Sequence, residues 1–274
     1  MSNVTEKFSL DGQAAIITGG AGLLGRPFSR ILGEAGASVV VADLDISGAE
    51  AHAQHLSDVG LRAIALEVDV TDPDSVGTMV KRCVDSFGGV DILVNSAALD
   101  PKFDPEHEGA QFGNRFEHYA LQDWQRSLDV NLTGVFLTCQ TAAREMVTRD
   151  KGVIINVSSI YGLKGPDQRI YPEKAGQKQY KPVDYAVTKA GILGLTRYLA
   201  AYYAGTQIRV NALTPGGVFH HHEDPFLKNY SEKTMVGRMA STDELSGALL
   251  FLASPASSYM TGANLVVDGG YTAW

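Results

Sequence analysis

The sequence predicts an α/β fold, a doubly wound parallel sheet of seven strands with helices on both faces. Two observations predict it. Short apolar runs alternate with helical segments seven times along the chain, and polar or glycine-rich loops follow several of these runs. A parallel strand reaches its neighbour through a crossover that is usually a helix, so the alternation favours parallel strands. The 274 residues contain no linker or shift in composition, so we expect one domain, 1–274.

Each strand is predicted from a short apolar run, because a strand covered on both faces has few polar residues. The runs lie at 14–17, 38–42, 63–70, 91–95, 152–158, 208–212 and 264–267. Ligands of such sheets bind beyond the carboxyl ends of the strands. We therefore expect substrate loops at about 99–121, 160–184 and 214–240.

Each helix is predicted from apolar residues that recur with a period near 3.6. These segments lie at 23–34, 47–59, 73–87, 122–148, 185–203 and 242–253. Helix 73–87 carries signals at both ends, with Thr71 as a possible cap, Pro73 in its first turn and Gly88 after its last residue.

A glycine-rich turn connects the first strand to the first helix. Gly19, Gly22 and Gly25 lie three apart, so they can supply unusual dihedral angles, close approach of a ligand and close contact between helix and strand. The start of the helix offers free N–H groups and a partial positive charge, which suit a pyrophosphate. A glycine-rich connection that binds nothing is the alternative.

Asp43 ends the second strand, 18 positions after Gly25. A carboxylate at this place can accept hydrogen bonds from both hydroxyls of an adenosine ribose, and it would repel a 2′-phosphate. The next residue is Leu44, where an enzyme that prefers NADP often has an arginine. The pattern therefore favours NAD over NADP as the cofactor.

Charge and composition bound the partners. The formal net charge is −8, the sequence pI is about 5.3 and no run of Lys and Arg occurs, which argues against a nucleic acid or a membrane surface as a partner. No apolar run approaches the length of a membrane span, and the polar start lacks a signal core, so we expect a cytoplasmic protein. Cys83 and Cys139 fall in helical patterns and are expected to be reduced core residues. A small-molecule substrate is the expected partner.

Tyr185 and Lys189 lie four positions apart on a predicted helix, hence on one face. A nearby ammonium stabilises a phenolate and lowers the pKa of a tyrosine, which is ordinarily about 10. Such a tyrosine can pass a proton near neutral pH. The alternative is that the two side chains belong to a solvated helix face.

Taken together, the motifs resemble those of the short-chain dehydrogenase/reductase family, in order and position, over nearly the whole chain. They are residues 18–25, 95–98, 130–134, 158–159, the pair Tyr185 and Lys189, residues 211–216 and residues 268–270. The resemblance implies a Rossmann-type fold, the single-domain branch of the family and oxidoreductase activity on CH–OH groups.

The resemblance also implies roles for individual residues. Tyr185 would be the general acid/base, Ser159 rather than Ser158 would hydrogen-bond the reacting oxygen, Lys189 would hold the nicotinamide ribose, and Asn131 would anchor a water in the proton path. The cofactor would lie against Gly19, Gly22, Leu23, Leu24, Gly25, Asp43, Leu44, Asp69, Val70, Asn95, Ala97, Tyr185, Lys189, Pro215, Gly216 and Val218.

Three departures from the family pattern matter. Leu23 stands where the single-domain branch has its middle glycine, and the glycine spacing resembles that of the extended, nucleotide-sugar branch. Ser159 and Tyr185 are 26 positions apart, about twice the usual gap, so an insertion follows the serine. Phe219 and His220 replace a threonine that commonly contacts the nicotinamide carboxamide.

The insertion carries a net charge of +2 in an acidic protein, from Lys164, Arg169, Lys174, Lys178 and Lys181 against Asp167, Glu173 and Asp184. This excess could attract an anionic substrate. A solvated loop or a subunit contact would explain it equally well.

Residues 220–222 are three histidines, followed by Glu223 and Asp224. Adjacent histidines cannot all converge on one ion, and no motif completes a site, so no metal is predicted. One of these histidines is better placed beside the substrate.

The sequence thus predicts an NAD-dependent enzyme that interconverts a secondary alcohol and a ketone on a polar, sugar-like substrate. The residues around 159–162 and 214–219 resemble a bacterial subset linked with surface-sugar synthesis, which favours a carbohydrate. A nucleotide-sugar epimerase or dehydratase that retains NAD, and a non-catalytic NAD-sensing protein, are the alternatives. Relatives pair through helices like 122–148 and 185–203, so a homo-oligomer is expected, a tetramer before a dimer.

Overall fold

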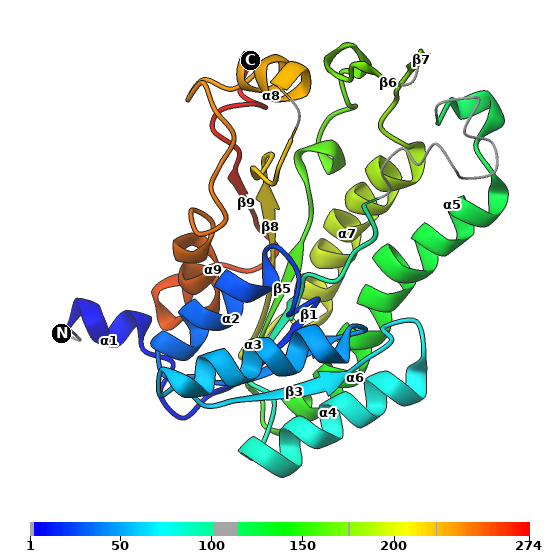
Figure 1. Ribbon diagram of the computed structural model, residues 1–274. Helices are drawn as coiled ribbons and strands as arrows, with labels where there is room; N and C mark the ends of the chain where they lie inside the picture. Colours follow the sequence, from blue (N-terminus) through cyan, green and yellow to red (C-terminus); the bar gives the residue numbers. More distant parts are fainter. Residues whose placement is uncertain (1–2, 101–113, 175, 223) are drawn as a thin grey trace.

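The computed structural model describes residues 3–100, 114–174, 176–222 and 224–274 (Figure 1). Its main sheet has seven strands, all parallel, in the order β3-β2-β1-β4-β5-β8-β9. The strands are β1 Ala14–Thr18, β2 Ser38–Asp43, β3 Ala63–Glu67, β4 Ile92–Asn95, β5 Gly152–Val157, β8 Ile208–Pro215 and β9 Asn264–Val267. The predicted doubly wound sheet is confirmed. The order reverses between β1 and β4, which is where such sheets bind ligands.

Helices cover both faces of the sheet. They are α2 Gly25–Glu34, α3 Ile46–Asp58, α4 Pro73–Phe87, α6 Gly134–Thr148, α7 Val183–Tyr202 and α9 Ser246–Ala253, and a further helix, α5 Leu121–Leu128, contacts α7. Neighbouring strand residues enter opposite cores, because side chains alternate along a strand. Ile16 packs in a core with α4, α6 and α7, whereas Ile17 packs in a core with α2, α3 and α9.

Cys83 and Cys139 are free and buried in the core with α4, α6 and α7, as predicted. Burial raises the pKa of each thiol to about 12, so both are inert at neutral pH.

Several predicted boundaries are wrong. The expected helix 122–148 is interrupted by a π-helical turn, η3 Asp129–Thr133. The expected strand 63–70 ends at Glu67, because the Asp69 carboxylate bonds the backbone and hydroxyl of Thr71 and turns the chain out of the sheet. Asp72, not Thr71, caps α4, since its side chain accepts from the Asp74 N–H. Helix α2 begins at Gly25 rather than at 23, and α9 at Ser246 rather than at 242.

The expected loops contain structure of their own. The insertion holds a small antiparallel hairpin, β6 Glu173–Lys174 and β7 Gln177–Lys178, and the segment 214–240 holds α8 Asp224–Ser231. Both lie on the side of the sheet toward which the carboxyl end of β8 points (Figure 1). A short α1, Val4–Phe8, precedes the first strand. Of the loop 99–121, residues 101–113 lie outside the described residues.

Asp91, just before β4, ties three strands together. Its buried carboxylate accepts from the Ala14 backbone N–H at 2.9 Å and from Arg149 Nη2 at 2.9 Å, and lies 3.3 Å from Lys151 Nζ. Asp91→Asn should lower the free energy of unfolding by about 1–3 kcal/mol. Arg149 and Lys151 would lose their counter-charge, and the new amide NH2 would face groups that can only donate hydrogen bonds. Urea unfolding followed by circular dichroism measures this loss.

Asp85→Asn is the matched control for Asp91→Asn. It removes an exposed carboxylate that pairs with Lys81 on α4, and such pairs contribute about 0–1 kcal/mol. Equal losses of stability in the two variants would contradict the role of Asp91.

Candidate active site

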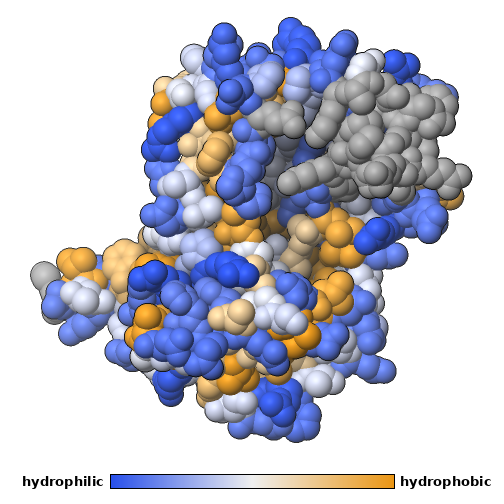
Figure 2. All heavy atoms as spheres, viewed as in Figure 1, coloured by the Kyte–Doolittle hydropathy of each residue, from blue (hydrophilic) through white to orange (hydrophobic). Residues whose placement is uncertain are grey.

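The surface is hollowed between the part of the molecule that carries α8 and the part that carries α2 and α3, with hydrophobic residues at the floor (Figure 2). The carboxyl ends of the strands face the same side. The described segments that follow β1, β4, β5 and β8 hold most of the site residues predicted from the sequence.

The glycine turn after β1 is packed so closely that side chains do not fit. Gly19 has a φ of 65°, and a Cβ there would lie 2.8 Å from the backbone of Ala97. A Cβ on Gly25 would lie 2.0 Å from the carbonyl oxygen of Gly19. Gly20, which was not among the predicted site residues, is also confined, because a Cβ there would lie 2.9 Å from Val41 Cγ1. The second glycine of the pattern, Gly22, is less crowded, with 3.1 Å to the nearest atom.

Helix α2 starts directly after this turn. Its first residue follows Leu24, and no side chain caps the helix. Within the first turn the Arg26 N–H donates to the Gly22 carbonyl at 3.2 Å and Pro27 has no N–H, so it is the partial positive charge of the helix start that favours an anion here. Leu23 is partly exposed at the same place.

Asp43, at the end of β2, lies against the turn. One carboxylate oxygen accepts from the Ala21 N–H at 2.9 Å, and the other accepts from the Asp45 N–H at 3.1 Å. The following Leu44 is 66% exposed. Arg26 also contacts this corner, because its Nε donates to the Ala21 carbonyl at 2.7 Å. Ala21 is thus bound through its N–H by the Asp43 carboxylate and through its carbonyl by the Arg26 guanidinium.

Tyr185, Ser159 and Lys189 come together where β5 ends and α7 begins. Ser159 follows β5 and hydrogen-bonds the Tyr185 side chain, and Lys189 lies one helical turn beyond Tyr185 with Nζ 5.8 Å from the centre of its ring. Nζ of Lys189 is buried and donates to the Val157 carbonyl at 2.9 Å. The predicted shared face of Tyr185 and Lys189 is therefore present.

The two neighbouring serines differ in what they contact. Ser158 is buried and donates to the Lys189 backbone carbonyl at 2.8 Å, so its hydroxyl fastens α7 to β5. Ser159 faces Tyr185, and its hydroxyl also accepts from the Tyr161 N–H at 3.2 Å. The geometry therefore places Ser159, and not Ser158, beside Tyr185.

The expected lowering of the Tyr185 pKa is wrong for the protein alone. Burial raises the pKa of Tyr185 well above its ordinary value, the charge of Asp100 raises it further, and the hydrogen bond from Ser159 opposes both. The effect of burial falls on Lys189 as well, whose pKa is lowered to about 8. Desolvation disfavours the charged form of each group, which is why the pKa of Tyr185 rises while that of Lys189 falls.

Asn131 and Asn95 use their side-chain amides inside the protein. Asn131, in the π-helical turn, bonds both backbone groups of Leu99 at 2.7 and 2.9 Å and lies 3.3 Å from the Thr188 hydroxyl. Asn95 bonds Asn156 and accepts from Thr138. A contact of Asn95 with a ribose would therefore come from its backbone.

The remaining predicted cofactor residues lie at the rim of the strands. Asp69 is exposed beyond β3, whereas Val70 is buried against Gly134. Pro215 ends β8, and a Cβ on Gly216 would lie 2.8 Å from the Asp268 backbone. Val218 forms an isolated bridge with Ala240.

Asp100, Lys181 and Tyr230 were not among the catalytic or cofactor residues predicted from the sequence, although Lys181 belongs to the positive excess of the insertion. The Tyr230 hydroxyl accepts from the Gly217 N–H, and Lys181 lies over the Tyr185 ring. The sequence offered two signals for Lys181, its position four residues before Tyr185 and the positive excess of the insertion. The pairing of Lys181 with Asp100 joins positions 81 apart, so only the fold reveals it.

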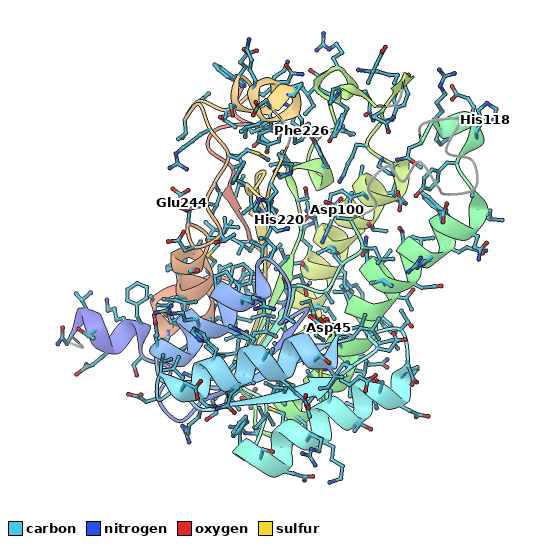
Figure 3. All side chains as sticks on the ribbon, viewed as in Figure 1. Asp45, Asp100, His118, His220, Phe226 and Glu244 are labelled. Carbon is cyan, nitrogen blue, oxygen red and sulfur yellow. The ribbon has the colours of Figure 1, made fainter. Side chains whose placement is uncertain are left out.

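The three histidines form a turn in which they do not converge. The His220 N–H donates to His222 Nδ1 at 3.1 Å, His221 has a positive φ of 50°, and the His222 ring packs on Phe226. His220 and Asp100 both lie toward the middle of the molecule, beyond the strand ends (Figure 3). Among the described residues, no three His, Cys, Asp or Glu side chains form a group that could hold a metal ion.

Comparison with known proteins gives consistent matches. A family model described as enoyl-(acyl carrier protein) reductase matches residues 21–272. The chain is 36% identical over 269 residues to cis-4-hydroxycyclohexanecarboxylate dehydrogenase of Sinomonas cyclohexanicum, covering 95% of this chain and 97% of that one. It is 34% identical over 270 residues to D-threitol dehydrogenase of Mycolicibacterium smegmatis, covering 97% and 95%.

A solved structure is also similar over the whole length. It is a gluconate 5-dehydrogenase from Burkholderia cenocepacia J2315 in complex with NADP and tartrate, with a TM-score of 0.87 and 30% identity, covering 99% of this chain and 100% of that one.

Proposed function

The chain belongs to the short-chain dehydrogenase/reductase family, single-domain branch, whose members bind NAD(P), and from that premise we propose that it interconverts a secondary alcohol and a ketone with NAD as its cofactor. The observation that carries the proposal is the meeting of Ser159, Tyr185 and Lys189 at the strand ends that also hold the glycine turn. Residues 1–274 act as one catalytic domain in this proposal.

The residues present fit a dinucleotide. The uncapped start of α2 suits its pyrophosphate, and Gly19, Gly22 and Gly25 leave no side chain in the way. Asp43 suits a ribose. Leu23, Leu24, Leu44, Asp69, Val70, Asn95 and Ala97 would complete the adenosine side, and Pro215, Gly216 and Val218 the nicotinamide side. Bound nicotinamide supplies a hydride acceptor or donor.

The chain's own residues move the proton. In the oxidising direction Tyr185 Oη takes the hydroxyl proton of the substrate while the carbon loses its hydride and the C–O bond becomes C=O. Ser159 Oγ holds the reacting oxygen beside it. The charge of Lys189 favours the phenolate, and Asn131 orders the backbone of Leu99 next to the site.

We propose a polar substrate, either a hydroxy acid or a polyol. The support is that the similar proteins are named for a hydroxycyclohexanecarboxylate, for threitol and for gluconate. The test is absorbance of reduced nicotinamide while the protein is offered NAD or NADP with these compounds and with nucleotide sugars. Formation of NADH with an acid or polyol supports the proposal. No NADH from any of them, with NAD binding intact, would overturn it.

The cofactor preference depends on Asp43. Asp43→Asn should lower kcat/KM with NAD roughly tenfold, equivalent to about 1.4 kcal/mol, and raise the ratio of NADP to NAD activity, because the repulsion of a 2′-phosphate is lost. Arg26 would then face that phosphate. Asp58→Asn, on the surface of α3, is the control. An unchanged ratio of the two cofactors would count against Asp43.

The glycine spacing favours one alternative, a nucleotide-sugar epimerase or dehydratase that retains NAD. NAD that copurifies with the protein, without net reduction of added NAD, would favour it. A non-catalytic NAD-sensing protein would keep its cellular effect after Tyr185→Phe. The likeness to the surface-sugar subset stays a prediction.

We also propose a homo-oligomer, a tetramer or a dimer, located in the cytoplasm. The support is exposed apolar surface on α5, α6 and α7, the helices expected to pair between subunits, namely Leu121, Phe136, Val147, Val187, Tyr198 and Tyr202. Of the helices in the described ranges, none has both the length and the apolar character of a membrane span. A monomeric mass in light scattering would contradict the oligomer.

A further inference from the structure

Lys181 lies on the face of the Tyr185 ring. Its Nζ is 3.9 Å from the ring centre, nearer than the 5.8 Å of Lys189. The side chain of Lys181 is only 12% exposed, and its ammonium forms an ion pair with the carboxylate of Asp100, the residue that follows Leu99. A carboxylate is therefore held beside the tyrosine by a residue of the insertion.

The insertion holds Lys181 in place through its backbone. The Lys181 N–H donates to Gln168 Oε1 at 2.8 Å, and Gln168 Nε2 donates to the Lys181 carbonyl at 3.1 Å. Ile170, two residues after Gln168, is buried, and its carbonyl accepts from Asn229 of α8 at 3.1 Å. The segment that binds the Lys181 backbone is thus itself held in place, so the position of the ammonium does not depend on the Asp100 pair alone.

We propose that Lys181 binds the carboxylate of a hydroxy-acid substrate, in the place that the Asp100 carboxylate occupies in the free protein. The proposal rests on the dehydrogenase function proposed above and selects the acid over the polyol. It gives the insertion between Ser159 and Tyr185 a role in specificity.

Exposure and charge favour an acid. The Asp100 side chain is 52% exposed, whereas that of Lys181 is only 12% exposed, so the carboxylate is the partner that can leave. An acid substrate replaces one carboxylate with another and keeps the ammonium paired. A neutral polyol that displaced Asp100 would leave a nearly buried charge without a partner, which is costly. Because the Lys181 ammonium lies on the face of the Tyr185 ring, a substrate carboxylate bound to it also lies close to the Tyr185 hydroxyl, which takes the proton.

The test compares gluconate and cis-4-hydroxycyclohexanecarboxylate with their primary amides, which keep the shape and lose the charge. Lys181→Gln should lower the acid-to-amide ratio of kcat/KM by about tenfold to a hundredfold through KM, because a charge-assisted bond is lost. Lys181→Arg should recover part of the ratio. Asp100→Asn should lower the KM of the acid, because the competing carboxylate is gone.

Arg169→Gln is the matched control, since it removes one exposed positive charge from the same insertion and should leave the ratio unchanged. A ratio that stays within twofold in Lys181→Gln would overturn the proposal. So would a rise in KM for acid and amide alike in Asp100→Asn, which would show that the pair recognises hydroxyls.

A binding measurement separates this proposal from the dehydrogenase function. Gluconate should raise the Tm of the wild-type protein with NAD present more than gluconamide does, and Lys181→Gln should abolish the difference. No NADH formation together with this difference would overturn the reaction and support the carboxylate site. An equal effect of acid and amide on wild-type Tm would overturn the site.

Discussion

Tyr185→Phe should lower kcat by about 10²- to 10⁴-fold, the usual contribution of general acid–base catalysis, while NADH binding stays within about twofold. The phenyl ring keeps the packing against Lys181 and Lys189, so only the proton-bearing oxygen is lost. The measurement is the steady-state rate of NADH formation with the best substrate of the panel. Binding is followed by NADH fluorescence.

Tyr259→Phe is the control, because Tyr259 is fully exposed and should tolerate the same loss of a hydroxyl. Equal activity of the Tyr185→Phe protein and the wild type would remove Tyr185 from the reaction. A matching loss of NADH binding would instead show that the variant disturbs the cofactor site.

Gly25→Ala should cost about 1–3 kcal/mol of stability or more and weaken NADH binding at least tenfold. The added Cβ would lie 2.0 Å from the Gly19 carbonyl oxygen and 2.6 Å from Gly20 Cα, both backbone atoms. The turn must therefore open, which moves the N–H groups at the start of α2. Urea unfolding and NADH titration measure the two effects.

Gly77→Ala is the matched control for Gly25→Ala. Gly77 lies within α4, and nothing lies within 4 Å of a Cβ built there. Alanine at such a helical position should be neutral or stabilising by up to about 1 kcal/mol. If Gly25→Ala behaved like Gly77→Ala, the close packing of the turn would have no functional meaning.

The sequence was sufficient for the class of fold and for predicting that candidate site residues lie at the strand ends. Strands such as 38–42 and 152–158 are apolar throughout because both faces are covered, and that pattern is local. The spacing of Tyr185 and Lys189 is also local, since residues four apart share one face of a helix. Element boundaries depended on distant contacts. The apolar pattern over 122–148 predicts one continuous helix, whereas the structure has a π-helical turn at Asn131, whose side-chain amide bonds the backbone of Leu99.

By itself the sequence determined the seven parallel strands, the glycine turn, the carboxylate of Asp43 at the end of β2 and the presence of an insertion before Tyr185, because each depends on neighbours in the chain. Only the tertiary structure decided that Ser158 fastens α7 whereas Ser159 faces Tyr185, that burial raises the pKa of Tyr185 in the protein alone, and that Lys181 meets Asp100. These depend on desolvation and on contacts between residues far apart in sequence, which only the packing of the whole chain creates.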